Sequence, residues 1–223
     1  MSNTTPLPGS VAGAPIGALG CDTLGVLSAD HVKTLAEAGY KFCVRYVNLP
    51  NYASEPALTS AEAQTILQGG LALMVVQRAR AGTLTASGGT SDGSYAAQSC
   101  ADIGLPRGVN VWLDLESIGG DVFNYSNNWY TEVANAGYKP GVYVGPNISY
   151  QDTPVTGEQL YAYLKASHYW RSQSEVPNVD QRGYQMIQLF TQTKDLLGFY
   201  IDINVTQNDY RNDTVQWLQP ASC

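Results

Sequence analysis

The chain has few basic residues and no long apolar run, and both shortages narrow its range of partners. Its 223 residues carry 12 Lys plus Arg against 19 Asp plus Glu, for a formal net charge of −7. A phosphate backbone is bound by clustered cations, so we expect no nucleic-acid partner. A membrane span needs about 18 consecutive apolar residues, and no stretch approaches that length, so we expect no membrane partner. No pattern encodes an oligomeric interface, and a monomer is the default expectation.

Cysteine is also scarce. The 4 cysteines include no C-x-x-C pair, which argues against a zinc site and against a thioredoxin motif. We therefore expect neither a metal nor a cofactor.

A repeated pattern of helix, glycine and apolar strand runs through the chain. Residues 28–47 show it first, and residues 59–77 repeat it behind a capping box formed by Thr59 and Glu62. Residues 127–144 repeat it once more. Three such copies indicate βα units and a parallel sheet.

Eight strands are predicted in all, and eight is the number that closes a (β/α)8 barrel. The predicted strands span residues 18–23, 42–47, 72–77, 110–115, 141–144, 169–172, 185–190 and 199–205. Some connections, such as residues 191–198, are too short for a full helix, so we expect a single TIM-like α/β barrel whose late helices are short or missing. A doubly wound open sheet is the alternative, but no G-x-G-x-x-G follows the first strand. We expect one barrel domain, residues 16–223, behind an N-terminal extension, residues 1–15.

The cysteines can be placed on this scheme. Cys21 and Cys43 fall on neighbouring predicted strands, where either a disulfide or two buried thiols would fit. Cys100 and Cys223 could tie down the C-terminal tail, although spacing alone establishes no pairing.

The segment VNVWLDLES, residues 109–117, places two carboxylates on one face of a strand. Side chains two residues apart point the same way, so Asp114 and Glu116 face together. In a barrel they would lie at the carboxyl ends of the strands, where active sites are built. Asp22 and Asp202 fall at the ends of the first and last strands, which are neighbours in a closed barrel. We predict that these four acids form the catalytic site.

Further polar and aromatic residues near strand ends are candidates for binding a substrate. They are Arg45, Gln77, Tyr143, Trp170, Gln188 and Asn204. The plainer alternatives are that Arg45 pairs with an acid for structure and that the aromatic residues are barrel core. Asp114 with Glu116 could likewise be a structural pair, and Asp202 with Asn204 could bind a cation through oxygen ligands.

Crowded carboxylates separate in pKa, because burial and mutual repulsion raise the pKa of one of them. The protonated group can then act as a general acid while the ionised group stabilises positive charge. Cleavage of a glycosidic bond requires this division of labour.

The segment GTSDG, residues 89–93, matches the nucleophile-elbow pattern G-x-S-x-G. The residues before it are too polar and too few for a central strand, so we expect a loop. A Ser-His-Asp triad would also require His31 or His168 to reach this loop.

Seven of the predicted strands carry motifs of a known group. The motifs are CDT, RYV, WLDLES, GVYVG, YW, MIQLF and YIDINV, and the most distinctive stretch is GALGCDTLGVLSADHVKTLAEAGYKFCVRYV. Together they resemble the glycoside-hydrolase-like domains of the domain-of-unknown-function family 1906. These domains are similar in turn to glycoside hydrolase family 25, the lysozymes that cut peptidoglycan between N-acetylmuramic acid and N-acetylglucosamine. The likeness covers about residues 16–210.

The resemblance implies a retaining glycosidase that acts on a polysaccharide or on peptidoglycan. Glu116 would be the general acid, and Asp114 would assist the substrate's acetamido group during neighbouring-group attack, flanked by Asp22 and Asp202. A non-catalytic carbohydrate-binding barrel is the alternative. The start of the chain shows no signal peptide, but several N-x-S/T sequons, unless they are chance matches, favour an extracellular or cell-wall-associated protein.

Overall fold

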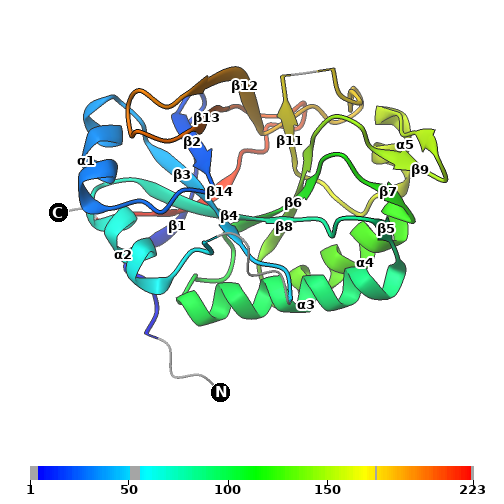
Figure 1. The fold of residues 1–223 in the computed structure, drawn as a ribbon, viewed down its shortest axis with the longest axis horizontal. Coiled ribbons are helices and arrows are strands. Elements are labelled where there is room, and N and C mark those ends of the chain that lie inside the picture. The colour runs from blue at the N-terminus through cyan, green and yellow to red at the C-terminus, as the bar shows by residue number, and fades with distance from the viewer. Residues whose placement is uncertain (1–4, 51–55, 174, 222–223) are drawn as a thin grey trace.

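Eight strands close into a barrel in this computed structural model, which describes residues 5–50, 56–173 and 175–221 (Figure 1). In order around the barrel they are β2 (Leu19–Thr23), β3 (Phe42–Val47), β4 (Ala72–Arg78), β6 (Asn110–Leu115), β8 (Lys139–Val144), β11 (Tyr169–Ser172), β12 (Met186–Thr193) and β13 (Ile201–Thr206). Each predicted strand has its counterpart here. The closing pair is β13 with β2, which confirms that the first and last predicted strands are neighbours.

The last strand departs from the expected regular barrel. The first seven barrel strands are parallel, but β13 runs antiparallel to both β12 and β2. Only residues 194–200 join β12 to β13, whereas a parallel return needs a dozen residues or more. The described residues of the late connections contain no helix, which confirms the expectation of short or missing late helices. The regular (β/α)8 arrangement is corrected to five strand–helix units followed by three strands, the last of them antiparallel.

Five helices are found in the described ranges, one after each of the first five barrel strands. They are α1 (Ala29–Glu37), α2 (Ser60–Gln68), α3 (Ala86–Ile103), α4 (Val122–Asn135) and α5 (Gly157–Tyr163). Ser28 and Thr59 form the predicted N-caps of α1 and α2. Glu62 does not complete the predicted capping box, because its carboxylate binds Arg45 instead. No described helix is both long and apolar enough to cross a membrane.

The GTSDG segment lies inside α3 and not in a loop, which corrects the sequence expectation. Gly89 and Gly93 let α3 approach α4, since a Cβ at Gly89 would lie 2.1 Å from the main-chain oxygen of Tyr125. Asp92 is fully buried, accepts the Tyr125 hydroxyl at 2.7 Å and pairs with Arg80. Glycine has poor helix propensity, so tertiary packing stabilises this helix. The helix replaces the strand–turn–helix that a nucleophile elbow needs.

Two further strands attach to the barrel at the start of β4. β14 (Gln216–Gln219) pairs with β4 at Leu73, whereas β4 pairs with β6 from Val75 onward. β1 (Ser10–Gly13) pairs with β14, so part of the expected N-terminal extension belongs to the same sheet. Short ribbons lie in the loops: β5 (Thr83–Leu84) with β7 (Gly119–Gly120), and β9 (Ser149–Tyr150) with β10 (Thr153–Pro154).

Cys21 and Cys43 are partners in the register of β2 with β3, and both are buried free thiols. A hydrogen bond with Cys43, together with burial, raises the pKa of Cys21 well above its ordinary value. Of the two alternatives, the structure thus contains the thiol pair. Cys100 is a third buried free thiol, and its suggested partner Cys223 lies outside the described residues.

Candidate active site

Four acidic side chains gather at one end of the barrel, the barrel mouth, where the parallel strands have their carboxyl ends. Asp22 lies near the end of β2, Asp114 lies near the end of β6, and Glu116 follows β6 directly. Asp202 enters from the opposite direction, because antiparallel β13 begins at the mouth. It is the direct partner of Asp22 in the register of β13 with β2. The fold thus brings together the four acids predicted from the sequence.

Three of the predicted binding residues form a hydrogen-bonded support for Asp22. Asn204 donates from Nδ2 to Asp22 Oδ2 at 2.7 Å, and Gln188 donates from Nε2 to the same oxygen at 3.0 Å. The Tyr143 hydroxyl in turn donates to Gln188 Oε1 at 2.7 Å. Asp22 is only 2% exposed, so these bonds replace the water that a surface carboxylate would keep.

The acids lie close enough to affect one another's ionisation. Burial raises the pKa of Asp22 to about 7, with repulsion from Asp202 and Glu116 adding to the rise and the amide hydrogen bonds opposing it. Burial also raises the pKa of Glu116, where Arg78 opposes the rise and Asp202 adds to it. Carboxylates with raised pKa values in a cleft are typical of acid–base catalysis.

An open cleft of about 320 Å³ lies along the Asp114 and Glu116 side of the mouth. Its lining residues are Arg78, Ala79, Ala81, Asp114, Glu116, Ser117 and Ile118. Glu116 is exposed, whereas Asp114 is 5% exposed and has the Arg78 Nε 3.9 Å from its Oδ2. The cleft therefore offers an accessible acid beside a buried carboxylate that has an arginine as its neighbour.

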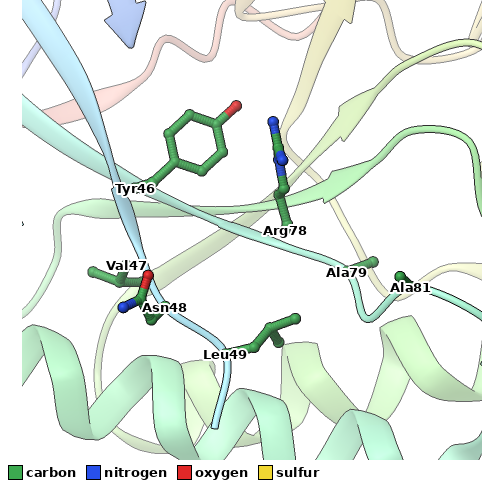
Figure 2. A pocket seen from close by; sticks show the side chains of 7 residues that line it. All are labelled: Tyr46, Val47, Asn48, Leu49, Arg78, Ala79 and Ala81. Atoms are coloured by element: carbon green, nitrogen blue, oxygen red, sulfur yellow. The ribbon is translucent and has the colours of Figure 1, made fainter. Parts of the chain in front are cut away.

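A smaller pocket of about 120 Å³ adjoins this cleft and shares Arg78, Ala79 and Ala81 with it. Figure 2 shows the Tyr46 ring and the Arg78 side chain extending in the same direction from neighbouring strands, with Leu49 on the other side of the pocket. The Arg78 guanidinium carbon lies 5.5 Å from the Tyr46 ring centroid. Burial raises the pKa of Tyr46 well above its ordinary value, and the negative charges of Asp114 and Asp22 add to the rise.

The sequence reasoning selected Arg45 and Gln77, whereas the side chains that line the pocket are those of the next residues, Tyr46 and Arg78. Adjacent residues of a strand point to opposite faces, so a choice that is one position off selects a side chain that faces the helices and not the mouth. Strands that are buried on both faces lack the polar–apolar alternation that would fix this choice. Pairing with Asp114 is the signal that could have identified Arg78, since the two are register partners.

Arg45 and Gln77 have no exposed surface with which to contact a sugar. Arg45 donates from Nε to Glu62 Oε1 at 2.7 Å, which matches the structural alternative considered for it. Gln77 accepts the Trp129 indole N–H at 2.7 Å. Trp170 is 1% exposed and packs against Tyr143 with ring centroids 4.6 Å apart, so it supports the mouth as core.

The Asn204 amide is used as a hydrogen-bond donor, whereas the cation alternative considered for Asp202 and Asn204 needs its oxygen as a ligand. Asn204 directs its Nδ2 donor to Asp22 and to the main-chain oxygen of Asp202. Among the residues that the structure describes, no group of three or more His, Cys, Asp and Glu side chains is arranged to hold a metal ion.

The sequence model of the Rv2525c-like, glycoside hydrolase-like domain family matches residues 33–196, and the chain belongs to this family. A curated relative, the uncharacterized protein FadG of Bacillus subtilis (strain 168), is 23% identical over 141 residues. That alignment covers 57% of this chain and 24% of FadG, so the match spans about a quarter of the relative's length.

Solved structures of an endolysin, a glycosyl hydrolase and an autolysin share the fold. The catalytic domain of endolysin ply40, from bacteriophage P40 of Listeria monocytogenes, has a TM-score of 0.62 at 14% identity, covering 87% of this chain and 95% of that chain. A family 25 glycosyl hydrolase from Bacillus anthracis has a TM-score of 0.52 at 14% identity, covering 88% and 91%. The autolysin LytC from Streptococcus pneumoniae, in complex with a synthetic peptidoglycan ligand, has a TM-score of 0.59 at 13% identity, covering 88% and 48%. At these identities the likeness shows the fold alone.

Proposed function

We propose that this chain is a lysozyme-like glycosidase that cleaves N-acetylated cell-wall glycan, with peptidoglycan as the substrate. The observation that carries the proposal is the gathering of Asp22, Asp114, Glu116 and Asp202 at one barrel mouth, beside an open cleft. Membership of a glycoside hydrolase-like family supports the reaction class, and the peptidoglycan ligand of LytC supports the choice of polymer. An extracellular or cell-wall location is part of the same proposal.

Glu116 is the general acid in this proposal. Its raised pKa favours the protonated form, and its exposure gives the proton a path to the substrate. The proton passes to the glycosidic oxygen as the bond to the leaving sugar breaks, while the substrate's own acetamido oxygen attacks the anomeric carbon. Water then opens the cyclic intermediate and returns a proton to the Glu116 carboxylate, so the anomeric configuration is retained.

Asp114 is the carboxylate that orients the acetamido group and balances the charge that develops on its nitrogen. Its burial suits this role, because a carboxylate enclosed by the protein stabilises a developing positive charge with little reorganisation. Asp202 raises the pKa of Glu116. Asp22 is the fourth acid of the group, and its ionisation is coupled by charge repulsion to that of Asp202 and Glu116. Tyr143, Gln188 and Asn204 hold Asp22 and are positioning residues.

Digestion of purified peptidoglycan tests the proposal, with new reducing ends counted and the fragments identified by mass spectrometry. Glu116→Gln keeps the size of the side chain and removes the proton donor, so we expect the rate to fall about a thousandfold. Glu37→Gln is the matched control, because Glu37 is exposed on α1 outside the cleft, and it should retain the wild-type rate. An unchanged rate in Glu116→Gln would remove Glu116 from the acid role.

The same assay separates the enzyme from a non-catalytic carbohydrate-binding barrel. Wild-type protein that pellets with insoluble peptidoglycan but releases no reducing ends would establish the binding barrel and overturn the glycosidase proposal.

A further inference from the structure

A second open cleft, of about 440 Å³, lies between α4, β9 and α5. Figure 1 shows α5 and β9 next to each other with α4 beneath them, and α4 contacts β9. None of the four acids of the barrel mouth lines this cleft. The catalytic proposal therefore makes no use of it.

Three aromatic rings form a connected platform in this second cleft. The Phe123 ring centroid lies 5.0 Å from that of Tyr150 and 5.2 Å from that of Tyr163. Phe123 is 9% exposed and forms the base, whereas Tyr163 is 59% exposed. Ring contacts thus fix the position of a tyrosine that remains accessible to a ligand.

Polar groups surround the platform. The Asp121 carboxylate orients the Asn124 amide, whose Nδ2 lies 3.0 Å from each carboxylate oxygen. Gln159 Oε1 accepts a hydrogen bond from the backbone N–H of Thr156 at the start of α5, so the side-chain N–H groups of Gln159 can donate to other partners. No Lys or Arg is among the described residues that line the cleft, so an anionic ligand would find no counter-charge.

These features match the surface of a neutral sugar. A sugar ring has an apolar face that stacks on an aromatic ring, and its rim of hydroxyl and acetamido groups exchanges hydrogen bonds with carboxylates and amides. Asp121 follows Glu116 by only five residues, so their Cα atoms lie at most about 18 Å apart. The distance along the protein from Glu116 to the Asp121 edge of the second cleft is therefore no longer than a few linked sugar units.

We propose that this platform of Phe123, Tyr150 and Tyr163 is a second glycan-binding site, which anchors the polymer while another part of it occupies the catalytic cleft. The identity of the ligand as a glycan rests on the proposed function. Binding at this platform can be tested independently of catalysis, because the platform would hold the polymer whether or not the barrel mouth cleaves it.

Pelleting with insoluble peptidoglycan tests this second site, in a Glu116→Gln background that prevents turnover. Tyr163→Ala removes the accessible ring and should weaken binding about tenfold. Tyr163→Phe keeps the ring and should bind within about twofold of its parent. Tyr95→Ala is the matched control, because Tyr95 is a 41% exposed tyrosine on α3, and it should bind like the parent.

Equal binding by Tyr163→Ala and its parent would overturn the second site, as would an equal loss in Tyr95→Ala. The two proposals fail separately. Hydrolysis without any dependence of binding on Tyr163 would leave the glycosidase and remove the anchor. Binding that depends on Tyr163, in a protein that releases no reducing ends, would leave the anchor and remove the glycosidase.

Discussion

Asp22 and Asp202 face each other across neighbouring antiparallel strands, so two carboxylates share one side of the barrel mouth. Burial, followed by repulsion from Asp202, raises the pKa of Asp22 from 3.8 to about 7. Between these two values the folded protein holds a proton that the unfolded chain has released. The stabilising effect of that proton is therefore complete in acid, and it is lost as the pH rises toward 7.

Asp22→Asn should remove this pH dependence. The asparagine oxygen can still accept the hydrogen bonds from Gln188 and Asn204, but no charge needs to be buried. We expect the variant to gain up to about 4 kcal/mol in free energy of unfolding at pH 8 and to match wild type near pH 4. Urea denaturation at the two pH values measures the difference. Asp195→Asn, at an exposed position, should follow wild type, and an equal gain at both pH values would show that charge burial is not the cause.

Asp202 and Arg78 should move the pH–rate profile in opposite directions. Asp202 raises the pKa of Glu116, so Asp202→Asn should lower that pKa and shift the basic limb of the profile to lower pH. Arg78 lowers the same pKa, so Arg78→Met should shift the basic limb to higher pH. The measurement is kcat/KM for peptidoglycan solubilisation across the pH range.

The decisive result is that the basic limbs of the two variants shift in opposite directions. General damage to the site would lower the rate of both variants without separating their basic limbs. Glu37→Gln, far from Glu116 in the chain and on the outer helix α1, provides the unshifted reference. Shifts in the same direction for both variants would rule out Glu116 as the titrating acid.

The barrel was predictable because its signals are local and repeated. Helix caps such as Ser28 and Thr59, glycine stops and apolar strands recur along the chain, and eight strands of that kind fit few folds. The antiparallel direction of β13 was missed. The short connection before this strand was interpreted as a degenerate or missing helix, and not as a direct return that reverses the strand. Helix α3 was missed in the GTSDG segment because its glycines serve the contact with α4, which exists only in the folded state.

The four acids were predictable for a different reason. A charged residue in an apolar strand is conspicuous, and closure of the barrel puts the first strand beside the last. The residues that line the mouth were harder to predict, because Arg45 and Tyr46 are adjacent in β3 and differ only in the face on which each lies. The partner of Arg45 is Glu62, which belongs to the next helix, and the sequence reasoning had given Glu62 a capping role.

Gly89→Ala should destabilise the protein although alanine favours helix. The added Cβ would lie 2.1 Å from the main-chain oxygen of Tyr125, so α3 and α4 would have to separate. We expect a loss of about 1–3 kcal/mol in the free energy of unfolding, measured by urea denaturation. Ser91→Ala, at an exposed position of the same helix, should stay within about 0.5 kcal/mol of wild type. Similar effects of the two substitutions would mean that propensity, and not close packing, decides the stability of α3.

The buried pair of Arg45 and Glu62 gives a test that separates a structural role from substrate binding. Glu62 Oε1 accepts bonds from Arg45 Nε at 2.7 Å and from the backbone N–H of Leu27 at 2.9 Å. Glu62→Gln would leave a buried guanidinium without its counter-charge, so we expect the free energy of unfolding to fall by about 3–5 kcal/mol. The KM for soluble peptidoglycan fragments should remain that of wild type in the fraction that stays folded, because Arg45 is fully buried.

A double variant shows whether the loss comes from the unpaired charge. Arg45→Met with Glu62→Met removes both charges and fills much of the same volume, so it should be more stable than Glu62→Gln alone. Its stability is measured by urea denaturation, and its KM again by initial rates. A KM that rises several-fold in the double variant, at a temperature where the protein is folded, would return Arg45 to the substrate-binding role. An unchanged KM with recovered stability would show that the pair is structural and holds β3 against α2. Arg45 would then act on the helix side of β3, whereas Tyr46 lies on the mouth side of the same strand.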